Sequence, residues 1–421
     1  MLKNCWPAVP IEDLCTRVTS GGTPPRSNPA YYDGGTIPWI KTGELRGWYV
    51  DDIAERITPA AVRESSAKVF PPETVLLAMY GDGKTMGSVG LIRAPAATNQ
   101  ACCAMLADPQ KCDPKFLMYS LVYFKPAILK LAISGAQRNL NGKSIKQFAI
   151  GAPPVEVQQR IASILSTYDD LIENNTRRIA ILEGMARRIY EEWFVRFRFP
   201  GHEGVRMVES ELGLVPDGWR VVPLAEMVDT QYGYTESAQD KPIGPKFLRG
   251  MDINKQPYID WSAVPYCPIH PDELPKFRLS VGDVVVIRMA DPGKIGIVEK
   301  AIDAVFASYL VRLRITDQRM TPYFLFYLLT GERYQGYITG VSTGTTRKSA
   351  SAPVITGVKV VMPTEDLMSE YNEYVVPLRR LLNTLLDKNS NLRTTRDLLL
   401  PKLISGELDV SALYEPEGLA A

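Results

Sequence analysis

Two stretches of the chain carry hydrophobic residues at a spacing that predicts long amphipathic helices. The first, residues 155–198, contains one glycine and no proline. Its apolar stripe, with one polar exception, recurs every seven residues at Ile161, Tyr168, Asn175, Leu182 and Ile189. Such a stripe is typical of a helix that packs lengthwise on another helix.

The second stretch, residues 365–404, repeats this pattern at Tyr371, Leu378, Leu385, Leu392 and Leu399. Pro377 is expected to kink or divide this helix, and Pro401 to end its regular part, because proline has no amide hydrogen. We expect the two helices to pair antiparallel. Asn175 and Asn389 would then face each other and fix the register of the pair, at some cost in stability.

The rest of the chain alternates short Val/Ile/Leu runs with Gly, Pro, Asn and Asp, as strands and tight turns require. One such block precedes each helix, and the two blocks match in order. Trp39-Ile-Lys41 through Glu44 matches Phe247-Leu-Arg249 through Asp252 at an offset of 208 residues. Other matches fall at offsets between 208 and 213 residues, which indicates an internal repeat.

The sequence therefore predicts an α+β chain. Two globular β-rich domains, related by pseudo-two-fold symmetry, would be separated by two long antiparallel helices that form a coiled-coil spacer. The expected bounds are 1–152 for the first domain, 153–200 for the central helical region, 201–362 for the second domain, 363–406 for the C-terminal helical region and 407–421 for the tail.

Composition narrows the chemistry. The 421 residues carry a formal net charge of +1, which excludes a polycation and requires any nucleic-acid binding to use local basic patches. Two histidines and six cysteines without a CxxC pair predict no metal site, and reduced thiols in a cytoplasmic protein. Without a long apolar run or an apolar N-terminal segment, we expect neither a membrane span nor a signal peptide.

Two segments imitate catalytic motifs. Residues 78–85 follow the loose pattern of a phosphate-binding loop, but two glycines and no helical spacing come after them, which favours a hairpin between strands. Asn28-Pro-Ala-Tyr31 is one residue from a motif of adenine-N6 methyltransferases, but no cofactor-binding strand–turn–helix precedes it, which favours a turn. No catalytic constellation is predicted.

Basic and polar residues in the glycine- and asparagine-rich loops of both repeats remain as candidate DNA contacts. A long cation on a loop can pair with guanine edges or phosphates, and the alternative for each is a surface ion pair. The candidates are Lys41, Thr42, Arg46, Lys84, Arg138, Asn139, Lys143, Lys246, Arg249, Arg288, Lys294, Arg347 and Lys348.

Together these features resemble the specificity subunit of type I restriction–modification systems, over nearly the whole chain. The resemblance is carried by Gly22-Thr-Pro24 through Trp39, by Leu182-Glu183 through Phe199-Pro200, and by Pro401-Lys-Leu-Ile-Ser-Gly-Glu-Leu408. Two departures stand out. Val157-Gln158 replaces the family's usual Glu-Gln, and the second domain has Gly233-Tyr-Thr-Glu where the first has Gly-Thr-Pro.

The resemblance implies that each β-rich domain reads half of a split site in double-stranded DNA through the major groove. It implies that the helices set the spacing and dock two methyltransferase subunits, and that restriction subunits join the complex. The chain itself would carry no cofactor and no active site. S-adenosylmethionine, ATP and Mg would belong to the partners, which methylate adenine and cut DNA.

An aromatic cluster at the end of the first helix suggests a partner-binding anchor, since Trp and Tyr dominate interface hot spots. The alternative is burial against the chain's own second domain. The cluster consists of Tyr190, Trp193, Phe194 and Phe197. Two other functions stay open from the residues alone: a stand-alone DNA-binding regulator with two reading heads and, less favoured, an adenine-N6 methyltransferase with recognition domains.

Overall fold

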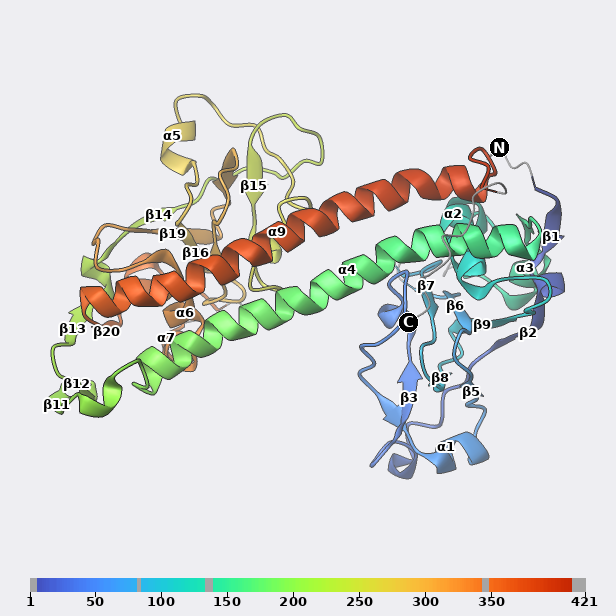
Figure 1. Cartoon of the computed structure of the whole chain (residues 1–421), viewed down its shortest axis with the longest axis horizontal. Coiled ribbons are helices and arrows are strands. Elements are labelled where there is room, and N and C mark those ends of the chain that lie inside the picture. Colours follow the sequence, from blue (N-terminus) through green and yellow to red (C-terminus); the bar gives the residue numbers. More distant parts are fainter. Residues whose placement is uncertain (1–5, 82–84, 133–138, 343–347, 411–421) are drawn as a thin grey trace. The chain divides into compact units, whose positions relative to one another are not determined.

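The computed structural model describes residues 6–81, 85–132, 139–342 and 348–410. The chain divides into two units, one made of residues up to Glu173 together with those from Asn391 onward, and the other of Asn174–Ser390. Each long helix therefore contributes a segment to both units (Figure 1).

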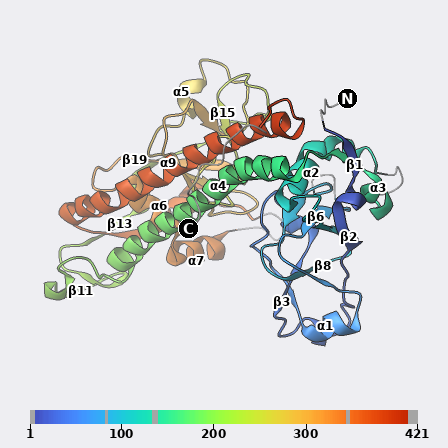
Figure 2. The ribbon, with the colours of Figure 1, turned by 45° about the vertical axis from the view of Figure 1, so that its right-hand side comes forward.

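Unit 1 is built on a four-stranded sheet of order β2-β9-β6-β7, with a second small sheet of order β4-β3-β8-β5 and a strand pair β1-β10. Helix α2 covers one face of the first sheet at β6 and β7 (Figure 2). The strands are β1 (Ala8–Pro10), β2 (Cys15–Ser20), β3 (Ile37–Ile40), β4 (Arg56–Ile57), β5 (Val69–Phe70), β6 (Val75–Ala78), β7 (Val89–Leu91), β8 (Ala96–Thr98), β9 (Cys102–Ala107) and β10 (Ala149–Gly151). The helices are α1 (Pro59–Glu64), α2 (Pro114–Leu129) and α3 (Gly142–Gln147).

Unit 2 repeats this plan with a sheet of order β14-β19-β16-β17, a pair β15-β18 and a pair β13-β20, and adds the hairpin β11-β12. The strands are β11 (Met207–Ser210), β12 (Gly213–Pro216), β13 (Arg220–Pro223), β14 (Val228–Tyr232), β15 (Lys246–Leu248), β16 (Val284–Ile287), β17 (Ile295–Ile297), β18 (Ala304–Phe306), β19 (Leu310–Ile315) and β20 (Lys359–Met362). The helices are α5 (Leu274–Phe277), α6 (Pro322–Thr330), α7 (Glu332–Val341) and α8 (Ala352–Thr356).

The repeat seen in the sequence is thus a repeat of topology. In both units the third strand of the main sheet pairs with its two neighbours in the same antiparallel sense. The short parallel pairs also correspond: β3 with β8 in unit 1, and β15 with β18 in unit 2. The prediction of two sheet-rich domains in a mixed α and β chain is confirmed.

Strands β6 and β16 are buried along their whole length, since their alternating side chains enter two different cores. In unit 1, Val75 and Leu77 face the core that contains α2, whereas Leu76 and Ala78 pack with Ile40 in a second core. Unit 2 divides the residues of β16 in the same way. The strands β3 and β15 contribute Ile40 and Leu248 to these second cores, so the loops that follow them begin at a packed core.

A glycine follows the first strand of each main sheet because the backbone there passes close to another strand. A Cβ on Gly21 would lie 2.1 Å from the carbonyl oxygen of Thr98, and one on Gly233 would lie 2.2 Å from that of Ala307. Only glycine fits such an approach. The second domain therefore keeps a glycine at this place although it lacks the Gly-Thr-Pro sequence.

The long helices are α4 (Val155–Tyr190), followed by a π-helical turn over Glu191–Val195, and α9 (Glu365–Ile404). The helix expected over residues 365–404 has these bounds, and Pro377 does not divide it. The expectation that Pro401 ends the regular part is wrong. A proline removes only its own amide donor, and Ser405 still donates to the carbonyl of Pro401 at 3.1 Å.

Within unit 2 the two helices run antiparallel. Leu182 packs with Leu382, and Ile179 with Leu385, in one apolar cluster. At the next turn Asn175 Nδ2 donates to Asn389 Oδ1 at 2.9 Å. Both amides are nine-tenths buried or more. The hydrogen bond is present, and the role of the pair in fixing the register stays a prediction.

The two segments that imitate catalytic motifs are described to different extents. Strands β6 and β7, on either side of the phosphate-loop-like sequence, pair antiparallel as neighbours, although residues 82–84 lie outside the described part. Asn28 caps a 3-10 turn over Pro29–Tyr31 by accepting the amide hydrogen of Ala30. The five described cysteines are free thiols. No helix among the described residues is long and apolar enough to cross a bilayer.

Candidate DNA interface

In unit 1 three loops with candidate residues meet at one edge of the sheets. The amide of Leu140 donates to the carbonyl of Met79 at 3.0 Å, which joins the loop before α3 to the loop after β6. Gly47 donates to Val89 at 2.8 Å, which joins the segment after β3 to the start of β7. The structure therefore brings residues 41–47, 79–81, 85–89 and 139–143 together.

The equivalent loops of unit 2 also meet. Ala290 donates its amide hydrogen to Lys348 at 3.0 Å, and Ala350 donates to Arg288 at 2.8 Å. The loop after β15 joins them, since a Cβ on Gly250 would lie 3.3 Å from the side chain of Ile287. Each unit thus has an edge that combines the same three loops, and we call these the reading edges.

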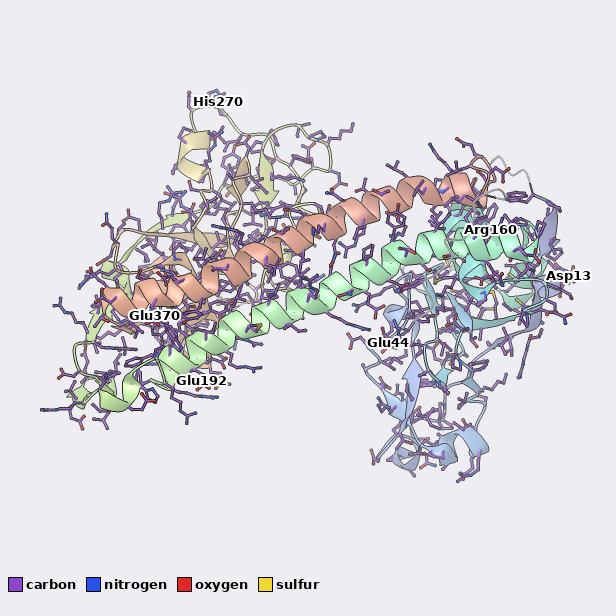
Figure 3. All side chains as sticks on the ribbon, viewed as in Figure 1. Asp13, Glu44, Arg160, Glu192, His270 and Glu370 are labelled. Carbon is purple, nitrogen blue, oxygen red and sulfur yellow. The ribbon has the colours of Figure 1, made fainter. Side chains whose placement is uncertain are left out.

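The candidate cations that directly follow β3 and β15 are Lys41 and Arg249, and we call them the leading cations. The acid three residues after each one shapes the backbone of its edge. Glu44 accepts the amide hydrogens of Lys41 at 2.7 Å and of Ala54 at 3.0 Å. Asp252 accepts the amide hydrogen of Arg249 at 2.8 Å. Each carboxylate caps a 3-10 turn, over Thr42–Glu44 or Gly250–Asp252. Figure 3 labels Glu44 in unit 1.

Both leading cations are engaged inside the chain. The Lys41 ammonium pairs with Glu55, which also binds Arg26 at 2.6 Å. Hydrogen bonds from Lys41 and then Arg26 hold the pKa of the Glu55 carboxyl below its usual range. Arg249 binds Asp252 with two nitrogens, at 2.9 and 3.0 Å. An ammonium has three N–H donors and a guanidinium five, so a contact with DNA need not break these ion pairs but must compete with the carboxylate for the position of the side chain.

Six of the other candidates divide into three groups. Lys246 lies on β15 itself, where its ammonium donates to the carbonyl of Val264 at 2.7 Å and sits 4.2 Å from the Tyr266 ring, so its contacts are structural. Thr42 and Asn139 are half-buried at the edge of unit 1. Three candidates, Lys84, Arg138 and Arg347, lie outside the described residues.

Five candidates remain available at the edges. Four are exposed and form no ion pair with any described residue: Arg46, Lys143, Lys294 and Lys348. The fifth, Arg288, is half-buried, with its guanidinium 4.9 Å from the ring of Tyr232. These side chains can approach a polyanion without breaking an internal ion pair among the described residues.

Two exposed tyrosines lie on these loops, and no sequence pattern selects them. Tyr309, at 56% exposure, accepts the amide hydrogen of Arg288 through its carbonyl, and Tyr80 is exposed beside the loop after β6. A single tyrosine in a loop has no periodic signal. Only the fold shows that these exposed tyrosines belong to the same loops as the candidate cations, where their rings can contact bases or sugars.

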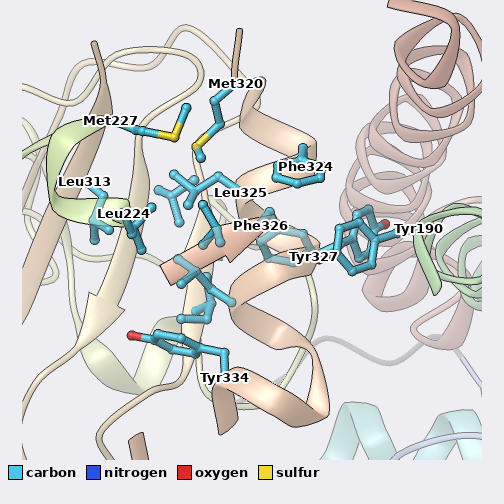
Figure 4. Packing of buried hydrophobic residues seen from close by; sticks show 14 of the residues in the cluster. Tyr190, Leu224, Met227, Leu313, Met320, Phe324, Leu325, Phe326, Tyr327 and Tyr334 are labelled. Carbon is cyan, nitrogen blue, oxygen red and sulfur yellow. The ribbon is translucent and has the colours of Figure 1, made fainter. Parts of the chain in front are cut away.

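The aromatic cluster predicted to bind a partner is part of the core of unit 2. Tyr190, Trp193 and Phe194 are each less than 10% exposed. Tyr190 packs against Phe324 and Tyr327 of α6 (Figure 4). The rings have the packing of the intramolecular alternative, because α6, Trp219 and Tyr371 of α9 cover the apolar surface at the end of α4. Phe197, half-buried, stands edge-on to Trp219.

Nothing in these edges has the composition of a metal centre. Among the described residues no group of three or more His, Cys, Asp or Glu side chains converges as ion ligands would. The chemistry that the edges offer is binding by cations, amides and aromatic rings.

Comparison with known proteins agrees with this arrangement. Residues 4–183 match the type I restriction modification DNA specificity domain. The chain is 27% identical to the type I restriction enzyme MjaIX specificity subunit of Methanocaldococcus jannaschii, over 97% of this chain and 94% of that protein. It is 29% identical to the EcoR124I/EcoR124II specificity subunit of Escherichia coli, over 40% of this chain and 41% of that protein.

A solved structure shares the fold. The specificity subunit of a type I system from M. genitalium aligns over 95% of this chain and 96% of its own, with a TM-score of 0.59 at 16% identity. The alignment spans both units and both long helices.

Proposed function

We propose that this chain, which belongs to the family of type I restriction–modification specificity subunits, reads a bipartite DNA target with its two reading edges. It acts as the DNA sequence recognition subunit of such a complex. The family's subunits are not catalytic, so the chemistry would belong to other chains. Each edge would read one half of the target in the major groove.

One observation supports this proposal above the others. Two units of the same topology present the same three loops, with capped 3-10 turns at equivalent places and different side chains on them. A repeated backbone with divergent loop side chains suits two readers of two different half-sites. Phosphate contacts would position each edge, and base contacts would give the sequence preference.

The paired helices would set the distance between the half-sites, as the spacing of two DNA-reading elements sets the gap in other bipartite targets. We also propose that they dock two methyltransferase subunits, and that restriction subunits join this assembly. S-adenosylmethionine, ATP and Mg would be held by those partners. The free cations at the edges then need to supply only part of the affinity, which suits a chain of net charge +1.

Co-expression with candidate methyltransferase subunits tests the proposal. The expected result is stable co-purification and adenine methylation at a split, gapped sequence. Methylation by the chain alone would overturn it. Sequence-specific DNA binding with no methylation in any such complex would instead support a stand-alone regulator.

A further inference from the structure

Each β-rich domain meets the long helices through a charged residue at the same place in the fold. In unit 1, Ile92 donates its amide hydrogen to Thr74 just after β7, and in unit 2 Val298 donates to Asp283 just after β17. The residues that come next, Arg93 in unit 1 and Glu299 in unit 2, are therefore structural equivalents. Their charges are opposite.

In unit 1 the domain supplies the cation. Arg93 binds Glu173 of α4 through one nitrogen, at 2.8 and 3.0 Å from the two carboxylate oxygens. The same guanidinium binds Asp51 at 2.8 Å and lies 4.1 Å from the Tyr49 ring. Arg93 keeps 41% exposure in this contact.

In unit 2 the domain supplies the anion. Glu299 accepts two hydrogen bonds from Arg379 of α9, at 2.7 and 2.8 Å. Arg379 also donates to the carbonyl of Pro257 at 3.1 Å. The side chains of Arg379 and Glu299 are 0% and 4% exposed, so this pair is buried.

A second pair of equivalent residues has the same reversal. Tyr119 and Tyr327 occupy the sixth positions of α2 and α6, each of which begins with a proline. Tyr119 donates its hydroxyl hydrogen to Asp169 of α4 at 2.5 Å, whereas the Tyr327 hydroxyl accepts from Arg379 at 3.5 Å. The domain thus meets the carboxylates of α4 in unit 1, where Asp169 also pairs with Arg396 of α9, and the Arg379 guanidinium of α9 in unit 2.

Within one chain, the three residues between β10 and α4 already hold the first domain at the start of α4. We propose that this reversal makes each joint selective, so that neither domain docks on the helix segment that belongs to the other domain in a second copy of the chain. On the other segment, Arg93 would meet Arg379, and Glu299 would meet Asp169 and Glu173. Like charges at a closely packed joint repel, and a buried charge without its partner is strongly unfavourable. Two domains of one topology are thereby kept from exchanging their helix segments between copies of the chain. The inference rests on the repeated fold and does not depend on the DNA-reading proposal.

Hydrogen exchange on the full chain tests this. The variants are Arg93→Glu, Glu173→Arg and the double exchange Arg93→Glu/Glu173→Arg, with unit 2 of the same molecule as the internal control. Each single variant is expected to raise the exchange of α2 and of residues 160–173 about tenfold, which corresponds to about 1.4 kcal/mol. The double variant should recover most of that protection, because it gives unit 1 the polarity of unit 2.

Arg93→Gln separates a lost attraction from repulsion, and should raise exchange less than Arg93→Glu does. Unchanged exchange in Arg93→Glu would overturn the proposal. So would a double variant whose effect equals the combined effects of the two singles, because the damage would then come from contacts such as Asp51 inside the domain. If Arg93→Glu does not fold, rescue of folding by Glu173→Arg supports the proposal, and failure of that rescue contradicts it.

Discussion

The two reading edges share one backbone and differ in how they hold their leading cation. In unit 1 the partner of Lys41 is Glu55, which comes from another part of the sheet and is shared with Arg26. In unit 2 the partner of Arg249 is Asp252, the same carboxylate that caps the turn. Because each cap binds the backbone amide, the turn survives a change of the cation. The fold can therefore vary the side chains at an edge without losing the edge.

The contacts between each domain and the long helices also differ between the two units. The Arg379–Glu299 pair of unit 2 is buried, whereas the Arg93–Glu173 pair of unit 1 is half-exposed. Replacing Arg379 by Met leaves the Glu299 carboxylate buried without its partner, and should lower the unfolding free energy of unit 2 by about 3–5 kcal/mol. Arg93→Met should cost unit 1 about 0–1 kcal/mol, because that pair is screened by solvent. Hydrogen exchange resolved by unit measures both.

The matched control for this comparison is Arg380→Met, the exposed neighbour of Arg379, which should change little. Equal losses from Arg379→Met and Arg93→Met would contradict the distinction between a buried and an exposed joint.

The buried asparagine pair gives the next largest effect. Asn175→Leu or Asn389→Leu alone leaves one amide without its partner and should destabilise unit 2 by about 1–3 kcal/mol. The double variant should lose less stability than the two single variants together, since two leucine side chains have no polar groups that need a hydrogen-bond partner. Denaturant unfolding of the four chains gives the coupling, and strict additivity would rule out the register role.

The smallest expected effect distinguishes the two edges directly. Glu55→Gln weakens the attachment of Lys41 and Arg26 and should tighten DNA binding by about threefold at low salt, the scale of an exposed ion pair. The salt dependence should become steeper as more phosphates are contacted. Asp252→Asn weakens the attachment of Arg249 in the same way but also weakens the cap, so it should gain less. Titrations at several salt concentrations measure both, and weaker binding by Glu55→Gln would show that the pair is needed to shape the edge.

The parts of the fold that depend on periodicity were predictable. The helix over residues 365–404, the internal repeat and the contact between Asn175 and Asn389 all follow from spacing along the chain. The helical stretch predicted from the sequence runs to residue 198, whereas α4 gives way to a π-helical turn at Glu191. The change from α-helical to π-helical hydrogen bonding has no recognisable signature in this aromatic-rich sequence.

The ion pairs were not predictable in the same way. Glu55 is 14 residues from Lys41, and Arg93 is 80 residues from Glu173, so no local pattern joins them. The aromatic cluster at the end of α4 has the composition of an interface and of a core alike, and only the packing against α6 distinguishes them. Composition identifies which side chains can pair, and topology decides which of them do.

Base preference at each half-site, measured for complexes that contain Lys41→Ala or Arg249→Ala, tests the central claim most directly. Both substitutions remove only a side chain and leave the capped turn in place. Each should relax one half-site by about 1–3 kcal/mol of discrimination and leave the other half unchanged. Uniformly weaker binding to all sequences by both variants would contradict base reading by these cations and make them phosphate contacts.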